Sequence, residues 1–121
     1  MEIKEAQDKV RKFDEERGWK DNWNIKDLAL NITEEVGELW GLIKWIRDEE
    51  QKKVIKENKG EVANFTADTL FLILKIANQT GVDVEKAFKE VMEEYEKRMP
   101  ADKMKKVKHA NKLAGGHDEK Q

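Results

Sequence analysis

Residues 34–39, Glu34-Glu35-Val36-Gly37-Glu38-Leu39, place three carboxylates inside an apolar helical pattern. When Leu28 is set at zero and each residue adds about 100° of rotation, Leu39 and Ile46 fall within about 20° of it. Glu35 falls at about −20°, inside the same apolar stripe. Because a buried carboxylate without a partner costs several kcal/mol, the pattern predicts that something cationic meets Glu35.

Two interpretations of this acidic helix are open. In the first, the acids reach water, which is easiest for Glu38 and Glu34 at about −80° and −120°, on the edge of the stripe. In the second, the helix holds a hard divalent cation, because Mg²⁺ is bound by carboxylate oxygens and keeps waters for a phosphate substrate. The inward position of Glu35 favours the second interpretation.

The composition indicates one small domain that gains from association. Of 121 residues, 38% are hydrophobic and 41% are charged, so a monomer would bury a modest core, and we expect a homodimer or homotetramer. The net charge of −2 gives no electrostatic basis for binding nucleic acid or an acidic membrane. The lack of cysteine excludes disulfides and thiolate sites, and no segment resembles a signal peptide or a membrane span. We therefore expect a cytoplasmic protein.

The spacing of apolar residues predicts an all-α fold of four helices. The expected ranges are 3–17, 25–47, 48–77 with a looser turn at 58–60, and 84–99. We expect Gly81 to follow the third helix and Asp83 to cap the fourth. Residues 1–100 would form the domain, and the basic residues 101–121 a flexible tail.

The third predicted helix carries a second polar stripe. With Glu61 at zero, Asp68 falls near −20°, Lys75 near −40° and Asn64 near −60°. This stripe would be an ordinary solvent-facing edge if the helix lay on the surface. Against that, the helix is apolar on nearly every other side, which indicates a central position. Two inward acidic stripes on neighbouring helices would form a metal cage, and without metal their mutual repulsion should raise some pKa values.

The ordered motifs resemble those of the all-α nucleoside triphosphate pyrophosphohydrolases, in particular MazG-like proteins and their dCTP pyrophosphatase relatives. The resemblance covers roughly residues 18–100. Its parts are the stretch 34–39 followed by Lys44-Trp45, the lead-in Trp23-Asn24, the segments 67–71 and 76–83, and the closing segment 95–100.

This resemblance implies a four-helix bundle-like, MazG-type domain completed by oligomerisation. It also implies a hydrolase that uses Mg²⁺, with Mn²⁺ as a substitute, to cut a nucleoside triphosphate into monophosphate and pyrophosphate. By position, Glu35, Glu38 and Asp68 correspond to metal ligands. Glu34 corresponds to a further acid near the metal or the attacking water, and we expect Glu34 or Glu38 to orient that water.

One position departs from the family pattern. The second motif of the family is Glu-x-x-Asp, but the residue three before Asp68 is Phe65, which cannot bind a metal. Glu61 and Asn64 are the nearby oxygen donors on that face. Either Glu61 supplies the missing ligand, which we favour, or the site is depleted and binds metal or nucleotide without efficient turnover.

Several side chains are candidates for holding the substrate, and Asn64 is one of them. Those expected to hold the outgoing pyrophosphate are Lys44, Lys75, Lys97 and Arg98. Those expected to contact the base are Trp23, Asn24 and Trp45. The alternatives are solvated surface positions for the cations and packing anchors for the tryptophans.

Two other functions fit the same residues. One is a metal-stabilised helical oligomer that has lost turnover at Phe65, and the other is a nucleotide sensor that binds without hydrolysis.

Overall fold

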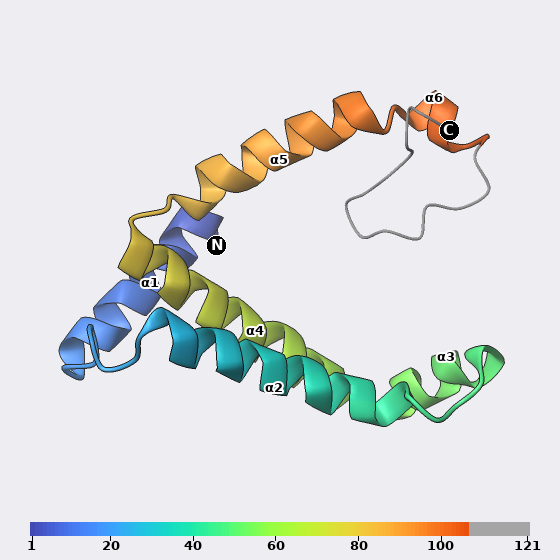
Figure 1. Ribbon diagram of the computed structural model, residues 1–121, viewed down its shortest axis with the longest axis horizontal. Helices are drawn as coiled ribbons and strands as arrows, with labels where there is room; N and C mark the ends of the chain where they lie inside the picture. Colours follow the sequence, from blue (N-terminus) through green and yellow to red (C-terminus); the bar gives the residue numbers. More distant parts are fainter. Residues whose placement is uncertain (107–121) are drawn as a thin grey trace. The chain divides into compact units, whose positions relative to one another are not determined.

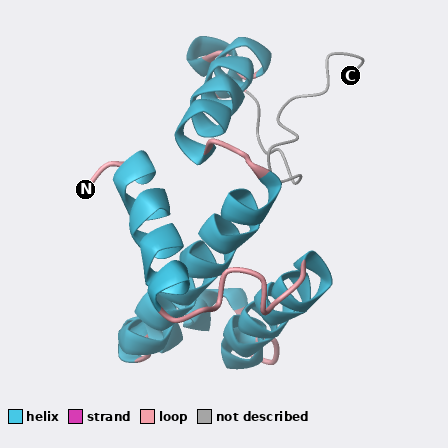
Figure 2. Cartoon of the chain, turned by 90° about the vertical axis from the view of Figure 1, so that its left-hand side faces the viewer, coloured by secondary structure: helices cyan, strands magenta, loops and turns pink. Residues whose placement is uncertain are grey.

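The computed structural model describes residues 1–106, which form helices and no strand (Figures 1 and 2). The all-α prediction is therefore confirmed for this part of the chain, while most of the predicted tail, from residue 107 onward, lies outside the described residues. By its internal contacts the chain divides into two units, Met1–Asp83 and Val84–Gln121. Among the described helices, we find none with the length and apolar character needed to cross a membrane.

The first unit contains four helices: α1 (Ile3–Glu16), α2 (Ile25–Ile43), α3 (Asp48–Glu57) and α4 (Lys59–Thr80). The helices α2 and α4 lie side by side and run in opposite directions, and α1 packs against α4 (Figure 1). Leu28, Leu74 and Ala77 are the buried apolar side chains of the described residues. The core is thus narrow and centred on α4.

Local hydrogen bonds explain where α2 begins. Asn24 is its N-cap residue: the Asn24 side chain accepts from the backbone N–H of Asp27 at 2.9 Å. In return, the Asp27 carboxylate accepts from the backbone N–H of Asn24 at 3.3 Å. This reciprocal capping box satisfies two of the N–H groups that a helix start leaves unpaired.

The expectation that Gly81 follows the third helix is confirmed, although that helix runs to Thr80 instead of Ala77. Gly81 follows α4 with a φ of 72°, a left-handed conformation in which glycine carries no Cβ penalty. The backbone N–H of Val82 donates to the carbonyl of Ala77 at 3.0 Å, which closes the last turn of α4.

The structure corrects two predicted boundaries. The helix expected over 25–47 ends at Ile43, and the single helix expected over 48–77 is split into α3 and α4 at Asn58. There the Asn58 side chain donates to the carbonyl of Val54 at 2.8 Å, and the residue leaves helical geometry with ψ 31°. Such a side-chain bond to the backbone competes with continuation of the helix. The split raises the four predicted helices to five, and a short helix at Ala101–Met104 makes six in the described residues.

The second unit contains α5 (Val84–Arg98) and the short α6 (Ala101–Met104), separated by an extended Pro100. The range of α5 agrees with the fourth predicted helix. The helix α6 occupies the first residues of the segment expected to be a tail.

Candidate functional site

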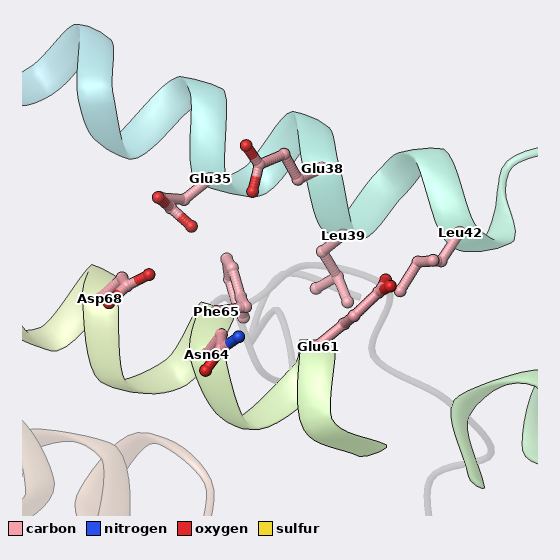
Figure 3. A pocket seen from close by; sticks show the side chains of 8 residues that line it. All are labelled: Glu35, Glu38, Leu39, Leu42, Glu61, Asn64, Phe65 and Asp68. Atoms are coloured by element: carbon pink, nitrogen blue, oxygen red, sulfur yellow. The ribbon is translucent and has the colours of Figure 1, made fainter. Parts of the chain in front are cut away.

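Glu35 on α2 and Asp68 on α4 face one another across the space between the two helices (Figure 3). Glu35 is half-buried and Asp68 is exposed. The pKa of Glu35 is raised above its ordinary value, first by desolvation and then by the negative charges of Glu38, Asp68 and Glu34. The sequence-based expectation that closely spaced acids raise a pKa is thereby met at Glu35.

An open pocket of about 170 Å³ lies between α2 and α4 at this position (Figure 3). Four of its lining residues are acids, and the others are an amide and three apolar side chains. The lining residues are Glu35, Glu38, Glu61, Asp68, Asn64, Phe65, Leu39 and Leu42. We call this space the acidic pocket. It brings together five of the residues that the sequence predicts for the site.

A second pocket, of about 230 Å³, shares Glu35 and Asp68 with the acidic pocket. We call it the adjoining pocket. Glu34, which the sequence predicts near the attacking water, lines it and is exposed. The rest of its lining is Asn31, Phe71 and Leu72. The facing pair Glu35 and Asp68 thus lies at the junction of two concave spaces, each lined by acids, an amide and apolar side chains.

The donor set of the acidic pocket suits a hard divalent cation, because it consists of carboxylate and amide oxygens. These side chains do not form a closed cage: within residues 1–106, no three or more His, Cys, Asp or Glu side chains are placed to hold a metal together. In Figure 3 the Phe65 ring stands between the pair Glu35 and Asp68 and the side chain of Glu61. The pocket therefore offers the right ligand chemistry in an open arrangement.

The structure does not bring Lys75 to the acidic pocket. Its Nζ atom lies 3.2 Å from Oδ1 of Asp14 on α1, and the Lys75 side chain is only 5% exposed. The ring centroids of Trp23 and Phe71 lie 4.3 Å and 4.8 Å from the same nitrogen. Burial, an ion pair and aromatic rings thus give this lysine a structural role, and its assignment as a pyrophosphate ligand stays a prediction.

The lead-in residues Trp23 and Asn24 are also engaged in the fold. Trp23 is half-buried and packs edge-on against Trp19, with ring centroids 5.3 Å apart. Asn24 caps α2. Neither lines the acidic pocket or the adjoining pocket, so Trp23 has the packing role of the alternative, Asn24 has a capping role, and their assignment as base contacts stays a prediction.

The remaining predicted contacts lie away from the two pockets or in the second unit. Lys44 Nζ lies 5.4 Å from the ring centroid of Trp45, which is 87% exposed, and neither residue lines the two pockets. Lys97 and Arg98 belong to α5, where Arg98 lies 3.6 Å from Glu94. Their prediction as pyrophosphate ligands stays a prediction.

Apart from Asn64, the sequence analysis did not assign the uncharged residues that line both pockets to the site. Asn31 had a usable signal, because it falls at about −60° from Leu28, between Glu35 and the acidic edge of α2. Leu39 and Leu42 carried no such signal in the sequence, because an apolar residue on the inward stripe of a helix is expected to belong to the core.

The fold and site define a class: an all-α protein with carboxylates from two antiparallel helices facing a shared pocket. The family model described as the MazG nucleotide pyrophosphohydrolase domain matches residues 23–102, and the chain therefore belongs to the MazG family. Neither the curated proteins nor the solved structures contain a match to this chain. Family membership indicates nucleotide pyrophosphohydrolase activity in general terms.

Proposed function

We propose that this chain is a Mg²⁺-dependent pyrophosphohydrolase that converts a ribo- or deoxynucleoside triphosphate into the monophosphate and pyrophosphate. The observation that carries the proposal is the pair Glu35 and Asp68, which face one another from α2 and α4 at the junction of two pockets. Membership of the MazG family supports the reaction class.

Glu35, Glu38 and Asp68 would hold the metal, with Glu61 in place of the ligand that Phe65 cannot supply. Mn²⁺ would be accepted as well, because its ligand preferences are similar. When bound, the ion neutralises charge on the triphosphate, which is the main demand of phosphoryl transfer. The pKa of Glu35 is raised first by desolvation and then by the charges of Glu38, Asp68 and Glu34, and a bound cation would offset both effects.

Glu34 and Glu38 are the proposed groups that orient the attacking water. A carboxylate oxygen of one of them would accept a hydrogen bond from the water and take its proton. The water oxygen then forms a bond to the α-phosphorus, while the bond from that phosphorus to the oxygen bridging it to the β-phosphorus breaks. Pyrophosphate leaves with the bridging oxygen, and the monophosphate stays behind.

The uncharged lining residues suggest that the acidic pocket holds the phosphates and the adjoining pocket holds the nucleoside. Asn64 can donate from its amide to a phosphate oxygen in the acidic pocket. In the adjoining pocket, Phe71 and Leu72 offer an apolar wall for the nucleoside. Lys44, Lys97 and Arg98 stay proposed partners of the outgoing pyrophosphate, and Trp45 of the base.

A second candidate function is a depleted site that binds metal or nucleotide in a helical oligomer without efficient turnover. It is favoured by the Phe65 ring, which lies between Glu61 and the pair Glu35 and Asp68, and by the absence of a closed cage in residues 1–106. A nucleotide sensor is one form of this alternative.

Pyrophosphate release from a panel of common and modified NTPs and dNTPs, with Mg²⁺ or Mn²⁺, separates these functions. The enzyme proposal predicts release that disappears in Glu35→Ala and persists in Glu15→Ala, a control at an exposed acid of α1 that lines neither pocket. Nucleotide binding in a direct titration without any release would instead establish the depleted site.

A further inference from the structure

A third pocket, of about 220 Å³, lies between α1, the loop that precedes α2 and the last turns of α4. It shares no lining residue with the acidic pocket or the adjoining pocket. Its lining combines three cations, two carboxylates and two amides. We call this space the polar pocket. Because every lining side chain can donate or accept hydrogen bonds, the pocket favours a polar ligand.

Asp14 and Lys75 are the most buried members of this lining, with side chains 10% and 5% exposed. We call them the buried pair. The Nζ atom of Lys75 lies 3.2 Å from Oδ1 of Asp14, yet this buried oxygen accepts no hydrogen bond within residues 1–106. A carboxylate can accept about four hydrogen bonds and an ammonium has several donors, so the buried pair keeps hydrogen-bonding capacity. A ligand that used this capacity would be bound favourably, because an unpaired buried polar atom is destabilising.

The walls of the polar pocket are held by hydrogen bonds within the chain. Arg11 Nη1 donates to Asp8 at 2.7 Å, and Arg11 Nη2 donates to Oδ1 of Asn78 at 3.1 Å. Nε2 of Gln79 donates to the carbonyl of Trp23 at 2.6 Å. Walls that are already fixed lose little conformational freedom when a ligand binds. The unused hydrogen-bonding capacity is therefore concentrated at the buried pair.

The charges of the lining indicate an uncharged ligand. The cations Arg11, Lys20 and Lys75 share the lining with the acids Asp14 and Asp21. Because the buried pair contains one charge of each sign, a ligand with a net charge would meet a like charge there. An uncharged ligand with an N–H donor beside an acceptor would satisfy both members of the pair. The Watson–Crick edge of each nucleobase has such neighbouring groups.

Phe71 links the polar pocket to the adjoining pocket. Phe71 lines the adjoining pocket, and its ring centroid lies 4.8 Å from the Nζ atom of Lys75. Lys75 follows Asp68 by about 10 Å along α4, at about 1.5 Å per residue. Pockets that hold a whole ligand usually measure about 300–1,000 Å³, so the smaller polar pocket suits one part of a ligand, such as a base.

We propose that the polar pocket binds the base edge of the nucleotide whose phosphates occupy the acidic pocket. Asp14 accepts a hydrogen bond from a base N–H, and Lys75 donates to the neighbouring acceptor of the base. This inference rests on the proposed function, since it assigns the base of that substrate. Asp14 and Lys75 are then specificity-determining residues as well as the link between α1 and α4. They reject a base whose N–H groups at this edge are replaced by N-methyl groups.

Nucleoside titrations of the full chain in EDTA test the base site without turnover. The ligands are the four common nucleosides, each beside a form in which methyl groups replace the N–H groups of the Watson–Crick edge. The rings of Trp19 and Trp23 lie 5.7 Å and 4.3 Å from the Nζ atom of Lys75, so tryptophan fluorescence should report binding. At least one nucleoside should bind about tenfold or more tightly than its methylated form. Equal affinities within every pair, or no binding at millimolar concentrations, would overturn the proposal.

The double variant Asp14→Leu/Lys75→Met removes both members of the buried pair and leaves neither charge behind. It should keep helical circular dichroism but bind each nucleoside and its methylated form equally. Glu15→Ala is the matched control, because Glu15 is an exposed acid beside Asp14 that lines none of the three pockets. It should keep the wild-type preference. A folded double variant that also kept the preference would overturn the proposal, and the wild-type titration decides it even if this variant does not fold.

Pyrophosphate release separates this inference from the proposed function. At subsaturating substrate, release from the preferred nucleoside triphosphate should be at least about tenfold faster than from its N-methylated form. Equal release from both forms would overturn the base site and leave the proposed function standing. Release from no nucleotide would overturn the proposed function, while the nucleoside titration would still decide whether the polar pocket binds a base.

Discussion

The Nζ atom of Lys75 lies 3.2 Å from Oδ1 of Asp14, and this ion pair joins α4 to α1 while both side chains are at least nine-tenths buried. The rings of Trp23 and Phe71 lie within 5 Å of the same nitrogen. Lys75, which shares the polar stripe of α4 with Asp68, thus joins α4 to α1. It lies one to two helical turns beyond the acidic pocket.

Removing one partner of this pair should destabilise the fold strongly. Lys75→Met leaves the Asp14 carboxylate buried without a cation, which should lower the free energy of unfolding by about 3–5 kcal/mol. The double variant Asp14→Leu/Lys75→Met should recover most of that loss, because no charge is then left buried. Urea unfolding of the three proteins measures both effects. A Lys75→Met variant as stable as wild type would show that the pair is unimportant.

The stability of the metal-free protein should depend on the ionisation of Glu35. Because its pKa in the folded state is raised above the ordinary 4.5, the folded protein holds this proton more tightly than the unfolded chain does. The resulting stability is present at low pH and is lost as pH rises through the folded-state pKa. In EDTA, Glu35→Gln should therefore melt higher than wild type at neutral pH, with a smaller difference below pH 4.5. A lower melting temperature at neutral pH would argue against charge repulsion at this site.

Bound Mg²⁺ should offset the destabilising repulsion between Glu35 and its acidic neighbours. A ligand that binds only the folded protein raises its melting temperature, by an amount that grows with ligand concentration. Addition of Mg²⁺ to wild type should raise the melting temperature relative to EDTA, and Asp68→Asn should lose most of the increase. Glu15→Ala, remote from both pockets, should keep it. An equal increase in all three proteins would point to a non-specific salt effect.

The pair Phe65 and Glu61 decides between an intact and a depleted site. If Glu61 supplies the missing ligand, Glu61→Gln should weaken Mg²⁺-dependent pyrophosphate release by about tenfold or more, and Phe65→Glu should leave release unchanged or reduce it. If Phe65→Glu raises release instead, the native site is depleted. Steady-state rates for the two variants distinguish these results.

That Glu35 and Asp68 face one another could be predicted from the sequence, because the 3.6-residue apolar repeat determines which side of each helix is turned inward. The partner of Lys75 could not. Lys75 shares the stripe of Asp68, but α1 crosses α4 at the level of Lys75, and the repeat of one helix contains no information about which helix crosses it.

Helix boundaries depend on local hydrogen bonds. The spacing Asn24-x-x-Asp27 is that of a capping box, and the predicted start of α2 at Ile25 is confirmed there. At Asn58 the looser turn was expected, but the complete break depends on a side-chain bond to the backbone that competes on nearly equal terms with the helix. Periodicity predicts which face is buried better than it predicts where a helix ends.

A crystal structure with Mn²⁺, whose anomalous scattering marks the ion, tests the central claim most directly. The account predicts one ion bound by carboxylate oxygens of both Glu35 and Asp68, at about 2.1–2.2 Å, with α2 and α4 contributing to the same coordination shell. An ion bound by one helix alone, or bound elsewhere while Glu35 and Asp68 contact only water, would contradict it.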